Sequence, residues 1–443
     1  MATDLKGLIK NRGIEYFLCS FVELTGAPKA KLVPAAAIEE VASEGAGFAG
    51  FACGDVGQGP HDPDVCSIPD FGSLLVLPWR KNVAWVPGNL HVSGQPWPYC
   101  PRTALAAQVE RASKLGYVLQ AGVEPEFMLL KRNSGGEYEP WDSLDTLGKP
   151  CYDLRALHRN LDLMTTLVGY MQELGWEPYA NDHEDANCQF EINWKYSEAM
   201  TTADRHTFFR WMVRTVAEQQ GLWATFMPKP FENLTGNGCH VHLSLARPGT
   251  GENLFLDEES RFGLSTLGRQ FMGGLLRHAR ALSAIIAPVV NSYKRLIRGA
   301  PRSGATWAPV YVTWGAGNRT QMIRIPGPGR IELRAMDGAA NPYLALAATL
   351  AAGLDGIANE IDPGAPNEGN LYEASEDELR ARGIGFLPTT LEKALDALEA
   401  DEVVRGALGP DYADLYIRVK REEWRQYNQS VTQWERDRYL PVY

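Results

Sequence analysis

The chain lacks any apolar run of the roughly 18 residues that a membrane span requires, and its first residues lack the apolar centre of a secretory signal. Nothing in the sequence therefore directs the protein out of the cytosol. We expect a cytoplasmic protein that contacts no membrane. The composition is otherwise that of an ordinary globular protein.

Cysteine is sparse and unclustered. An odd, scattered set in a chain without an export signal is typical of reduced thiols, and it argues against both disulfides and a zinc site. The seven cysteines are Cys19, Cys53, Cys66, Cys100, Cys151, Cys188 and Cys239.

Carboxylates are missing from one long segment. The net charge of -11 argues against nucleic acid as the main partner. Residues 260–331 nevertheless contain no Asp or Glu, while eleven Arg or Lys residues fall in the same stretch. These basic residues lie among apolar and Gly/Pro-rich positions, which favours a lined site for an anionic ligand over the alternative of a solvated basic face.

A length of 443 residues predicts two domains. The proline-rich stretch QPWPYCP is the expected boundary, between a small N-terminal domain (1–98) and a large C-terminal domain (99–443). In the small domain we expect helices at 3–12 and 35–43, strands at 14–24, 31–33, 74–79 and 83–86, and a Gly-rich loop at 45–64. In the large domain we expect helices at 103–115, 208–220, 264–286 and 342–360, and a mainly helical tail at 390–438.

Four predicted strands of the large domain alternate polar and apolar residues. Any one of them is consistent with an ordinary half-exposed strand. If all four are neighbours, several carboxylates and a histidine converge, and they raise one another's pKa values unless divalent cations neutralise them. The polar faces carry Glu124 and Glu126; Gln189, Glu191 and Asn193, shortly after Glu184; His240, His242 and Ser244; and Arg330, Glu332 and Arg334.

The types of these residues indicate a chemistry. Hard oxygen ligands with a single histidine favour Mg²⁺ or Mn²⁺ over Zn²⁺. Nearby arginines and lysines would then bind phosphate, which is the usual partition in phosphoryl transfer. The residues alone therefore favour a metal- and nucleotide-dependent enzyme over a purely structural sheet.

The segment KPFENLTGNGCHVHLS (229–244) resembles the ATP-region signature of the glutamine synthetase family: a Lys-Pro pair, a Gly-rich turn, then Gly-x-His and a serine four residues on. The resemblance implies an α+β protein with the glutamine synthetase fold. A small N-terminal β-grasp domain would precede a large catalytic domain, whose curved antiparallel sheet is flanked by helices. Further similar segments are EPEF at Glu124, HEDANCQFEI at His183, NSYKRL at Asn291, NRTQMIRIP at Asn318, RIELR at Arg330, NPYLALAA at Asn341 and NLYE at Asn370.

The resemblance also implies a role for individual residues. ATP would phosphorylate the γ-carboxylate of glutamate, and a nitrogen nucleophile would capture the acyl phosphate; Glu184, Arg295 and Arg319 would act in catalysis. The metal ligands for Mg²⁺ or Mn²⁺ would be Glu126, Glu184 and Glu191 at one site and Glu124, His240 and Glu332 at the other. The substrate-binding groups would be Gly236, Arg295, Arg334 and Glu126 for glutamate, and Arg319, Arg324, Arg330, His242 and Ser244 for ATP.

Members of this family form stacked hexameric rings in which the small domain completes a neighbour's active site. We therefore expect a homo-oligomer, in this case a dodecamer of two rings. The loop 45–64 would then reach across the interface between subunits.

Two acids that hold ammonium in ammonia-using members are missing. Where those members have an Asp-Gly-Ser-Ser loop, this chain has AGFAC (49–53), and where they have Gly-Tyr-Glu-Ala-Pro it has GAPRSGATWAP, which includes Trp307. A more apolar pocket suits an alkylamine, and a buried methyl group favours methylamine over ammonia by roughly 1–3 kcal/mol. The segments GAGFAG, DTLGKPCYD, DHEDANCQFEIN and SGATWAP also resemble the branch that contains γ-glutamylmethylamide synthetases (glutamate–methylamine ligases) and type III-like glutamine synthetases.

Several alternatives remain at this point. An ammonia-using glutamine synthetase needs only that other acids reach the site, and the residue that deprotonates the amine is open among Asp182, Glu184 and Asp55. A γ-glutamyl-polyamine ligase would need a more acidic channel. A non-catalytic ring scaffold would have lost metal or phosphate ligands, and none is lost. Tyr372 lies where some bacterial relatives are adenylylated, but we interpret it as an ordinary surface tyrosine.

Overall fold

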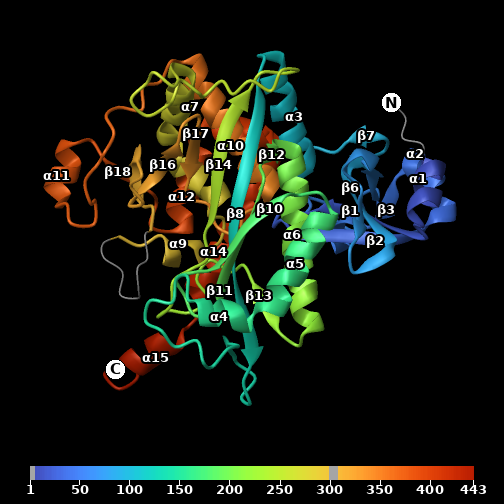
Figure 1. Cartoon of the computed structure of the whole chain (residues 1–443), viewed down its shortest axis with the longest axis horizontal. Helices are drawn as coiled ribbons and strands as arrows, with labels where there is room; N and C mark the ends of the chain where they lie inside the picture. The colour runs from blue at the N-terminus through green and yellow to red at the C-terminus, as the bar shows by residue number, and fades with distance from the viewer. Residues whose placement is uncertain (1–4, 299–307) are drawn as a thin grey trace.

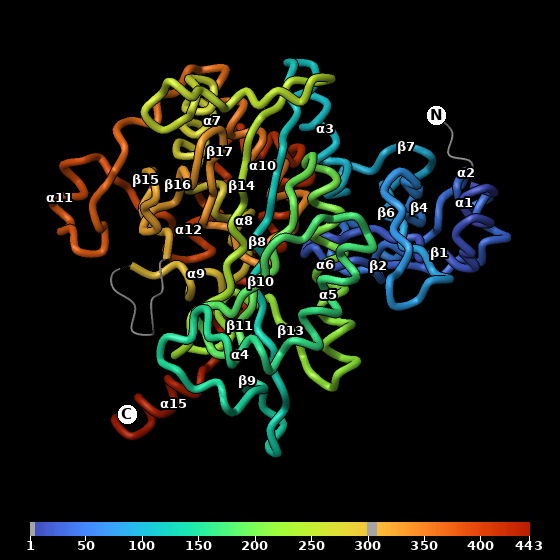
Figure 2. Tube along the Cα trace, in the orientation of Figure 1, coloured from blue at the N-terminus to red at the C-terminus, as the bar shows by residue number. Residues whose placement is uncertain are grey.

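The computed structural model describes residues 5–298 and 308–443 of the chain. In that part of the chain the strands form two sheets that pack with helices, so the protein has an α+β fold (Figure 1). The N-terminal part, with the smaller sheet, stands to one side of a larger body (Figure 2). The predicted division at residues 98/99 falls between the last strand of the smaller sheet and the next helix, and it stays a prediction.

The smaller sheet has a core of its own. Alternate residues of its strand β1, Phe17, Cys19 and Phe21, are buried in a cluster separate from the main core, as the two-residue period of a strand dictates. Strand β1 runs antiparallel to β2 and parallel to β6. The elements are β2 (Pro28–Pro34), β1 (Tyr16–Val22), β6 (Arg80–Val92), β4 (Val65–Pro69) and β3 (Ala46–Phe48) in sheet order, with β5 (Leu75–Leu77) and β7 (Gln95–Pro96) also paired to β6, and helices α1 (Leu5–Arg12) and α2 (Ile38–Glu44).

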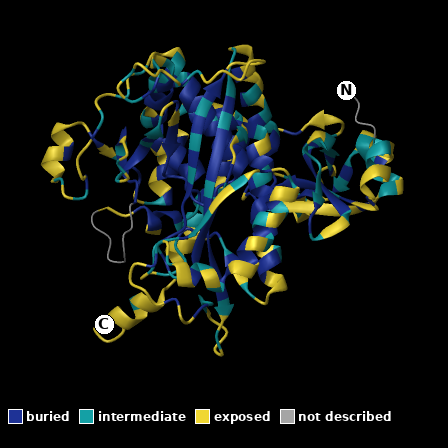
Figure 3. Cartoon of the chain, viewed as in Figure 1, coloured by how far each residue is buried: buried dark blue, intermediate teal, exposed yellow. Residues whose placement is uncertain are grey.

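The larger sheet forms the centre of the body. Its central strands mix buried with partly buried residues, as the dark blue and teal ribbon in Figure 3 shows. The sheet is antiparallel, as expected, except that β15 and β16 run parallel. In sheet order the strands are β10 (Pro178–His183), β11 (Gln189–Trp194), β8 (Val118–Arg132), β14 (Cys239–Ala246), β17 (Arg330–Leu333), β16 (Gln321–Gly327), β15 (Tyr311–Ala316) and β18 (Gly385–Phe386), while β9 (Tyr138–Pro140), β12 (Ser197–Glu198) and β13 (Trp223–Thr225) pair with β8.

Helix α10 packs behind this sheet and is buried along almost its whole length, which fits its run of Ala and Leu. It approaches α7 closely, since a Cβ on Gly274 would lie 2.1 Å from the carbonyl oxygen of Ala352. Within the described residues no helix is both long and apolar enough to cross a membrane. The helices are α3 (Pro101–Lys114), α4 (Leu154–Arg159), α5 (Leu161–Glu173), α6 (Ala199–Gln219), α7 (Thr266–Arg277), α8 (Ala279–Ile286), α9 (Ser292–Arg295), α10 (Pro342–Ala358), α11 (Glu376–Ala381), α12 (Leu391–Glu399), α13 (Glu402–Leu408), α14 (Pro410–Gln429) and α15 (Gln433–Tyr439).

A buried arginine joins the two parts of the molecule. Arg102, near the start of α3, donates to Asp204 of α6 from Nε at 3.1 Å and from Nη2 at 3.0 Å. The same guanidinium donates to Asp70 at 2.7 Å and to Asn89 at 3.1 Å, both in the smaller part. Asp204 also accepts the hydroxyl of Tyr343 on α10 at 2.7 Å. One charge therefore ties two helices of the body to the small sheet.

The segment 264–286, predicted as a single helix, is two helices, α7 and α8, which meet at His278. The imidazole of His278 lies between two carboxylates, with Nδ1 2.6 Å from Asp401 Oδ2 and Nε2 3.0 Å from Asp355 Oδ2. These contacts fix the break in the helix. Hydrophobic periodicity carries no signal for them, because both carboxylates are far away in the sequence.

This junction predicts a pH-dependent stability. Burial alone lowers the pKa of His278, but Asp401 and Asp355 outweigh burial and raise it above its ordinary value. The protonated ring therefore stabilises the fold fully below its unfolded pKa of about 6.5, and this contribution is lost as pH rises through the raised folded pKa. We expect His278→Gln to lower the free energy of unfolding by about 2 kcal/mol near pH 5.5 and by much less at pH 9. Urea denaturation at the two pH values checks this; an equal deficit at both would contradict the ionic role.

Candidate active site

Four strands that carry polar side chains are neighbours in the larger sheet, in the order β11-β8-β14-β17. Directly opposed residues of antiparallel strands lie on the same face of a sheet. The carboxylates and histidines of these strands therefore meet on one face. The opposed pairs are Glu191 and Glu126, His240 and Glu124, and His242 and Glu332.

Glu124, His240 and Glu332 offer ligand atoms that all lie within 4.8 Å of one another. The Nδ1 atom of His240 is 3.6 Å from Glu124 Oε2 and 3.5 Å from Glu332 Oε1. His242, two residues further along β14, places Nε2 2.9 Å from Glu124 Oε1. The trio is the set that the sequence analysis assigns to one of the two metal sites.

A second group joins Glu126 and Glu191 to the same histidine, His240. Glu184, assigned with Glu126 and Glu191 to the other metal site, lines the same cavity but is not a member of this group. It lies on the turn between β10 and β11, and so reaches the cavity from a different direction. The two groups share His240, so two cations bound here would be close neighbours.

A Gly-rich turn leaves room beside these ligands. A Cβ on Gly238 would lie 3.0 Å from Glu126 Oε1 and 2.9 Å from Arg295 Nη2. A Cβ on Gly236 would lie only 2.2 Å from the carbonyl oxygen of Pro228. The Gly238 N–H donates to Glu126 at 2.8 Å. Glycine therefore lets the backbone lie close to the Glu126 carboxylate at Gly238 and close to the backbone of Pro228 at Gly236.

Burial and mutual repulsion act on the carboxyl groups. Burial and the charge of Glu124 raise the pKa of Glu126 to about 7. Burial and the charges of Glu126 and Asp182 raise the pKa of Glu184 to about 9. Burial and neighbouring carboxylates also raise the pKa of Glu191 well above its ordinary value. These crowded carboxyl groups cannot all ionise at once, because their negative charges repel one another. Divalent cations bind carboxylate oxygens and neutralise such charges, so this set of residues fits metal ions.

Glu332 is an exception among these acids because arginines surround it. Its carboxylate lies 2.5 Å from Arg324 Nε and 2.6 Å from Arg334 Nη1, and 1% of its side chain is exposed. Burial alone raises the pKa of Glu332, but His240, Arg334 and Arg324 outweigh burial and lower it. Glu332 therefore remains ionised and orients both guanidinium groups.

The ligand groups open into a cavity of about 670 Å³ that is rich in charged side chains. Arg295 reaches it from α9, where its guanidinium donates to the carbonyl oxygens of Ala335 at 3.3 Å and Arg334 at 3.0 Å. The predicted site residues that line this cavity are Glu124, Glu126, Glu184, Glu191, Gly236, His240, Arg295, Arg319, Arg324 and Arg334. A cavity lined by both carboxylates and arginines suits an anionic substrate bound beside cations.

A second cavity, of about 810 Å³, lies on the other side of Glu124. Three predicted nucleotide residues line it: His242, Ser244 and Arg330. Two exposed aromatic residues, Tyr179 and Tyr196, also contribute to its wall. Since Glu124 lines both cavities, the phosphates of a nucleotide in this cavity would point toward the acids and arginines of the first.

Sequence reasoning missed part of both cavity walls. Lys149, Cys151 and Tyr152 line the first cavity from a loop, although the sequence analysis noted only that their segment resembles a branch of the family. Tyr179 and Tyr196 line the second from the ends of short strands. Residues in loops show no hydrophobic periodicity, so no such pattern indicated that Lys149, Cys151 and Tyr152 line a cavity. For Tyr179 and Tyr196 the one available indication was an aromatic residue beside a turn.

Three further expectations have mixed outcomes. Asp55 is exposed and lines neither cavity of this chain. The segment around Trp307 lies outside the described residues. Tyr372 is not the ordinary surface residue that we expected, because its hydroxyl donates to the carbonyl oxygen of Ala308 at 2.9 Å and its ring lies 5.9 Å from that of Tyr311. Burial raises the pKa of Tyr372.

Comparison with known proteins agrees with this geometry. Residues 98–439 match the protein family described as "Glutamine synthetase, catalytic domain". The chain belongs to the glutamine synthetase family. It is an ATP-dependent ligase, and this family uses divalent metals and small substrates such as ATP and glutamate.

Several relatives of this glutamine synthetase-family ligase match it over the full length. It is 47% identical to "Glutamine synthetase" of Rhizobium leguminosarum bv. phaseoli, covering all of both chains. It is 44% identical to "Glutamate--methylamine ligase" of Methyloversatilis universalis, covering 100% of this chain and 99% of that protein. The solved structure "GmaS/ADP complex-Conformation 1" superposes with a TM-score of 0.93 at 49% identity, covering 99% of this chain and 100% of that one.

Proposed function

We propose that this ligase joins the γ-carboxylate of L-glutamate to methylamine through γ-glutamyl phosphate, giving γ-glutamylmethylamide, ADP and phosphate. One observation carries the choice of amine: both acids that hold ammonium in ammonia-using members are absent from the sequence, while every predicted metal and phosphate residue is present. The likeness to a glutamate–methylamine ligase and to a GmaS structure supports it.

The shape of the first cavity supports the same amine. Ala308, Pro309 and Cys151 all line it and contribute apolar surface. Asp182 and Glu184 line the same cavity and offer carboxyl oxygens to the nitrogen of an amine. A methylammonium ion needs both features, because its methyl group is apolar and its nitrogen is charged. The proton acceptor is then one of these two acids, or Asp55 if a neighbouring subunit brings it to the cavity.

The residues of the chain divide the reaction between them. Arg295 and Arg334 hold glutamate, whose γ-carboxylate oxygen attacks the γ-phosphorus of ATP while the bond to ADP breaks. Arg319 and Arg324 neutralise the phosphoryl oxygens, to which Mg²⁺ or Mn²⁺ held by the acids would add positive charge. The bound ammonium nitrogen first gives one proton to a carboxylate. The neutral amine then attacks the acyl carbon, the carbon–oxygen bond to phosphate breaks, and the nitrogen loses a second proton to the departing phosphate.

Ammonia is the second candidate nucleophile. The proteins named "Glutamine synthetase" from two Rhizobium species are 47% and 46% identical to this chain. Asp182, Glu184 and Asp185 all line the first cavity and offer carboxyl oxygens to an ammonium ion. With ammonia the product would be glutamine, and the phosphoryl step would be unchanged.

Assembly and location belong to the same proposal. We propose a cytoplasmic dodecamer of two hexameric rings with active sites between subunits. The small sheet's loop 45–64, which includes β3 and the exposed Phe51 and Asp55, would lie against the first cavity of a neighbour. Sedimentation velocity of the purified protein measures the size of this assembly.

We expect kcat/KM for methylamine to exceed that for ammonia by about 10- to 200-fold, the range that one methyl group in an apolar pocket provides. Phosphate release with ATP, glutamate and Mg²⁺ or Mn²⁺ measures this, with methylamine, ammonia, ethylamine and putrescine as nucleophiles and a reaction without amine as control. Mass spectrometry identifies the amide product. A higher kcat/KM for ammonia than for methylamine would support the second candidate and reject the first.

A further inference from the structure

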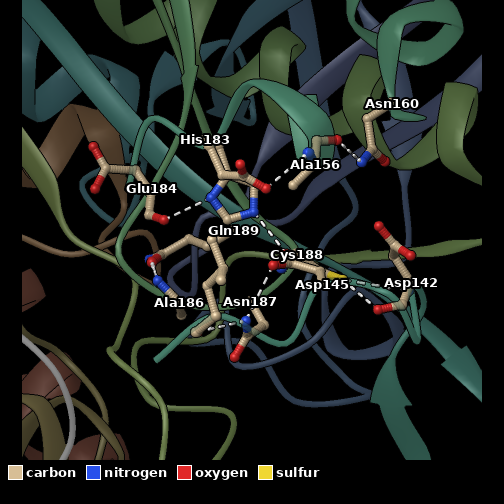
Figure 4. Close-up of polar contacts among 12 residues, drawn as sticks. Asp142, Asp145, Ala156, Asn160, His183, Glu184, Ala186, Asn187, Cys188 and Gln189 are labelled. Carbon is tan, nitrogen blue, oxygen red and sulfur yellow. Dashed lines mark hydrogen bonds and ion pairs between the residues drawn. The ribbon is translucent and has the colours of Figure 1, made fainter. Parts of the chain in front are cut away.

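A carboxylate outside the cavity walls holds the turn that carries Glu184. Asp145 lies in the loop between β9 and α4 and is buried. It accepts three hydrogen bonds from the turn between β10 and β11: from His183 Nε2 at 2.7 Å, from the Cys188 N–H at 2.6 Å and from Asn187 Nδ2 at 3.1 Å (Figure 4). These three bonds hold the turn at both ends, at His183 where it begins and at Asn187 and Cys188 where it ends.

The turn needs such support because its backbone is strained. Cys188 has φ of 59°, in the left-handed region that favours glycine, and it is fully buried. A residue in this conformation persists only where surrounding contacts hold it. The N–H of Cys188 is bonded to Asp145, and its sulfur accepts the N–H of Asp142 at 3.3 Å. The loop that contains Asp145 therefore supplies the contacts that fix Cys188.

The histidine connects Asp145 directly to the backbone of Glu184. His183 is fully buried, and while its Nε2 contacts Asp145, its Nδ1 lies 2.8 Å from the carbonyl oxygen of Glu184 (Figure 4). The N–H of Glu184 donates to the carbonyl oxygen of Gln189 at 2.8 Å. Both backbone polar groups of Glu184 are thus held, which leaves its side chain as the part that reaches the cavity.

The same contacts fix the loop wall of the cavity. The N–H of Tyr152 donates to the carbonyl oxygen of His183 at 2.8 Å, and Asn187 Nδ2 donates to the carbonyl oxygen of Leu147 at 3.2 Å. Residues 149–152 lie between these bonds and bring Lys149, Cys151 and Tyr152 to the cavity. A shift of the turn would therefore move this wall together with Glu184.

We propose that Asp145 is a positioning residue: through His183 and the backbone of Cys188 it holds Glu184 in the orientation that a divalent cation requires, and it aligns the wall 149–152 with it. Asp145 itself touches neither metal nor substrate. The proposal rests on the proposed role of Glu184 as a metal ligand but not on the identity of the amine. Partners that orient a ligand in this way affect metal affinity by 10- to 100-fold when they are removed.

The test compares Asp145→Ala and Asp145→Asn with two reference variants of the purified full-length protein. Asp153→Ala is the matched control: Asp153 lies in the same loop and caps α4 by accepting the Ala156 N–H at 3.1 Å, without a side-chain bond to the turn. Glu184→Gln tests the ligand itself. Mn²⁺ affinity is measured by electron paramagnetic resonance without substrates, thermal unfolding gives Tm, and phosphate release gives kcat and KM.

We expect Asp145→Ala to weaken Mn²⁺ binding 10- to 100-fold and to lower kcat by a similar factor. Asp145→Asn should weaken binding at least threefold, because its amide nitrogen cannot accept a hydrogen bond, and it serves as the main test if the alanine variant does not fold. Asp153→Ala should lower Tm while its Mn²⁺ affinity and kcat stay within twofold of wild type. Equal Mn²⁺ affinities for wild type and Asp145→Asn would overturn the positioning role. Unchanged Mn²⁺ binding in Glu184→Gln would instead reject the proposed metal site.

Discussion

Glu332→Gln is expected to lower kcat/KM for the amine by about 10³-fold. Glu332 contributes to the metal group with Glu124 and His240, and its carboxylate also lies between Arg324 and Arg334. Glutamine keeps the shape but removes the charge. The metal group then loses one of its two carboxylates, and the guanidiniums of Arg324 and Arg334 lose the anion that orients them. A single preorganised electrostatic contact is worth 10²- to 10³-fold in rate, and this change disturbs several.

Phosphate release at saturating ATP and glutamate measures the effect, and Tm separates loss of activity from loss of folding. The matched control is Glu252→Gln. Glu252 also pairs with an arginine, Arg247 Nε at 2.7 Å, but both side chains are more than half exposed and neither lines the two cavities. It should keep wild-type activity. If Glu332→Gln retains more than a tenth of the wild-type kcat/KM, the assignment of Glu332 to the site is wrong.

Arg102→Met is expected to lower the free energy of unfolding by about 3–5 kcal/mol, the usual cost of leaving one partner of a buried ion pair alone. Burial alone lowers the pKa of Arg102, but Asp204 and Asp70 outweigh it and raise the pKa. Without the guanidinium, the carboxylate of Asp204 would be buried with only the Tyr343 hydroxyl as a donor among the contacts described above. The smaller part would also lose the hydrogen bonds that Arg102 donates from α3 to Asp70 and Asn89.

Urea denaturation followed by tryptophan fluorescence measures this loss. The double variant Arg102→Met/Asp204→Asn should recover part of it, because the second change removes the unpaired charge. Lys195→Met is the control, since Lys195 and Glu177 form an exposed pair at 3.0 Å whose removal should cost at most about 1 kcal/mol. A loss in Arg102→Met no greater than that of Lys195→Met would contradict the joining role of the buried pair.

The strands that form the site could be predicted because their chemistry repeats with the period of a strand. Glu124 and Glu126 on β8, and His240 and His242 on β14, alternate with apolar residues that belong to the core. Such alternation shows which face each side chain occupies, but not which strand lies beside it. The resemblance to a known family supplied that adjacency, and the sheet order agrees with it.

Other parts of the fold and of the site depend on contacts between residues far apart in the sequence, which a local sequence pattern does not show. Strand β10 was not predicted, because Asn181 and Asp182 are polar and the strand exists through its pairing with β11. Asp145 was noted only as part of the segment DTLGKPCYD. No local pattern indicated its contacts, because they are with a turn some forty residues away in the sequence. The break at His278 has the same origin, because both of its acidic partners lie on distant elements.

The position of Glu124 in the walls of both cavities has a thermodynamic consequence. A ligand that changes the charge or orientation of this carboxylate from one cavity changes the free energy of binding in the other. By linkage, any factor by which the nucleotide alters the dissociation constant of glutamate must equal the factor by which glutamate alters that of the nucleotide. The two dissociation constants, each measured with the other ligand absent and saturating, therefore form a closed cycle that gives the coupling energy between the two cavities.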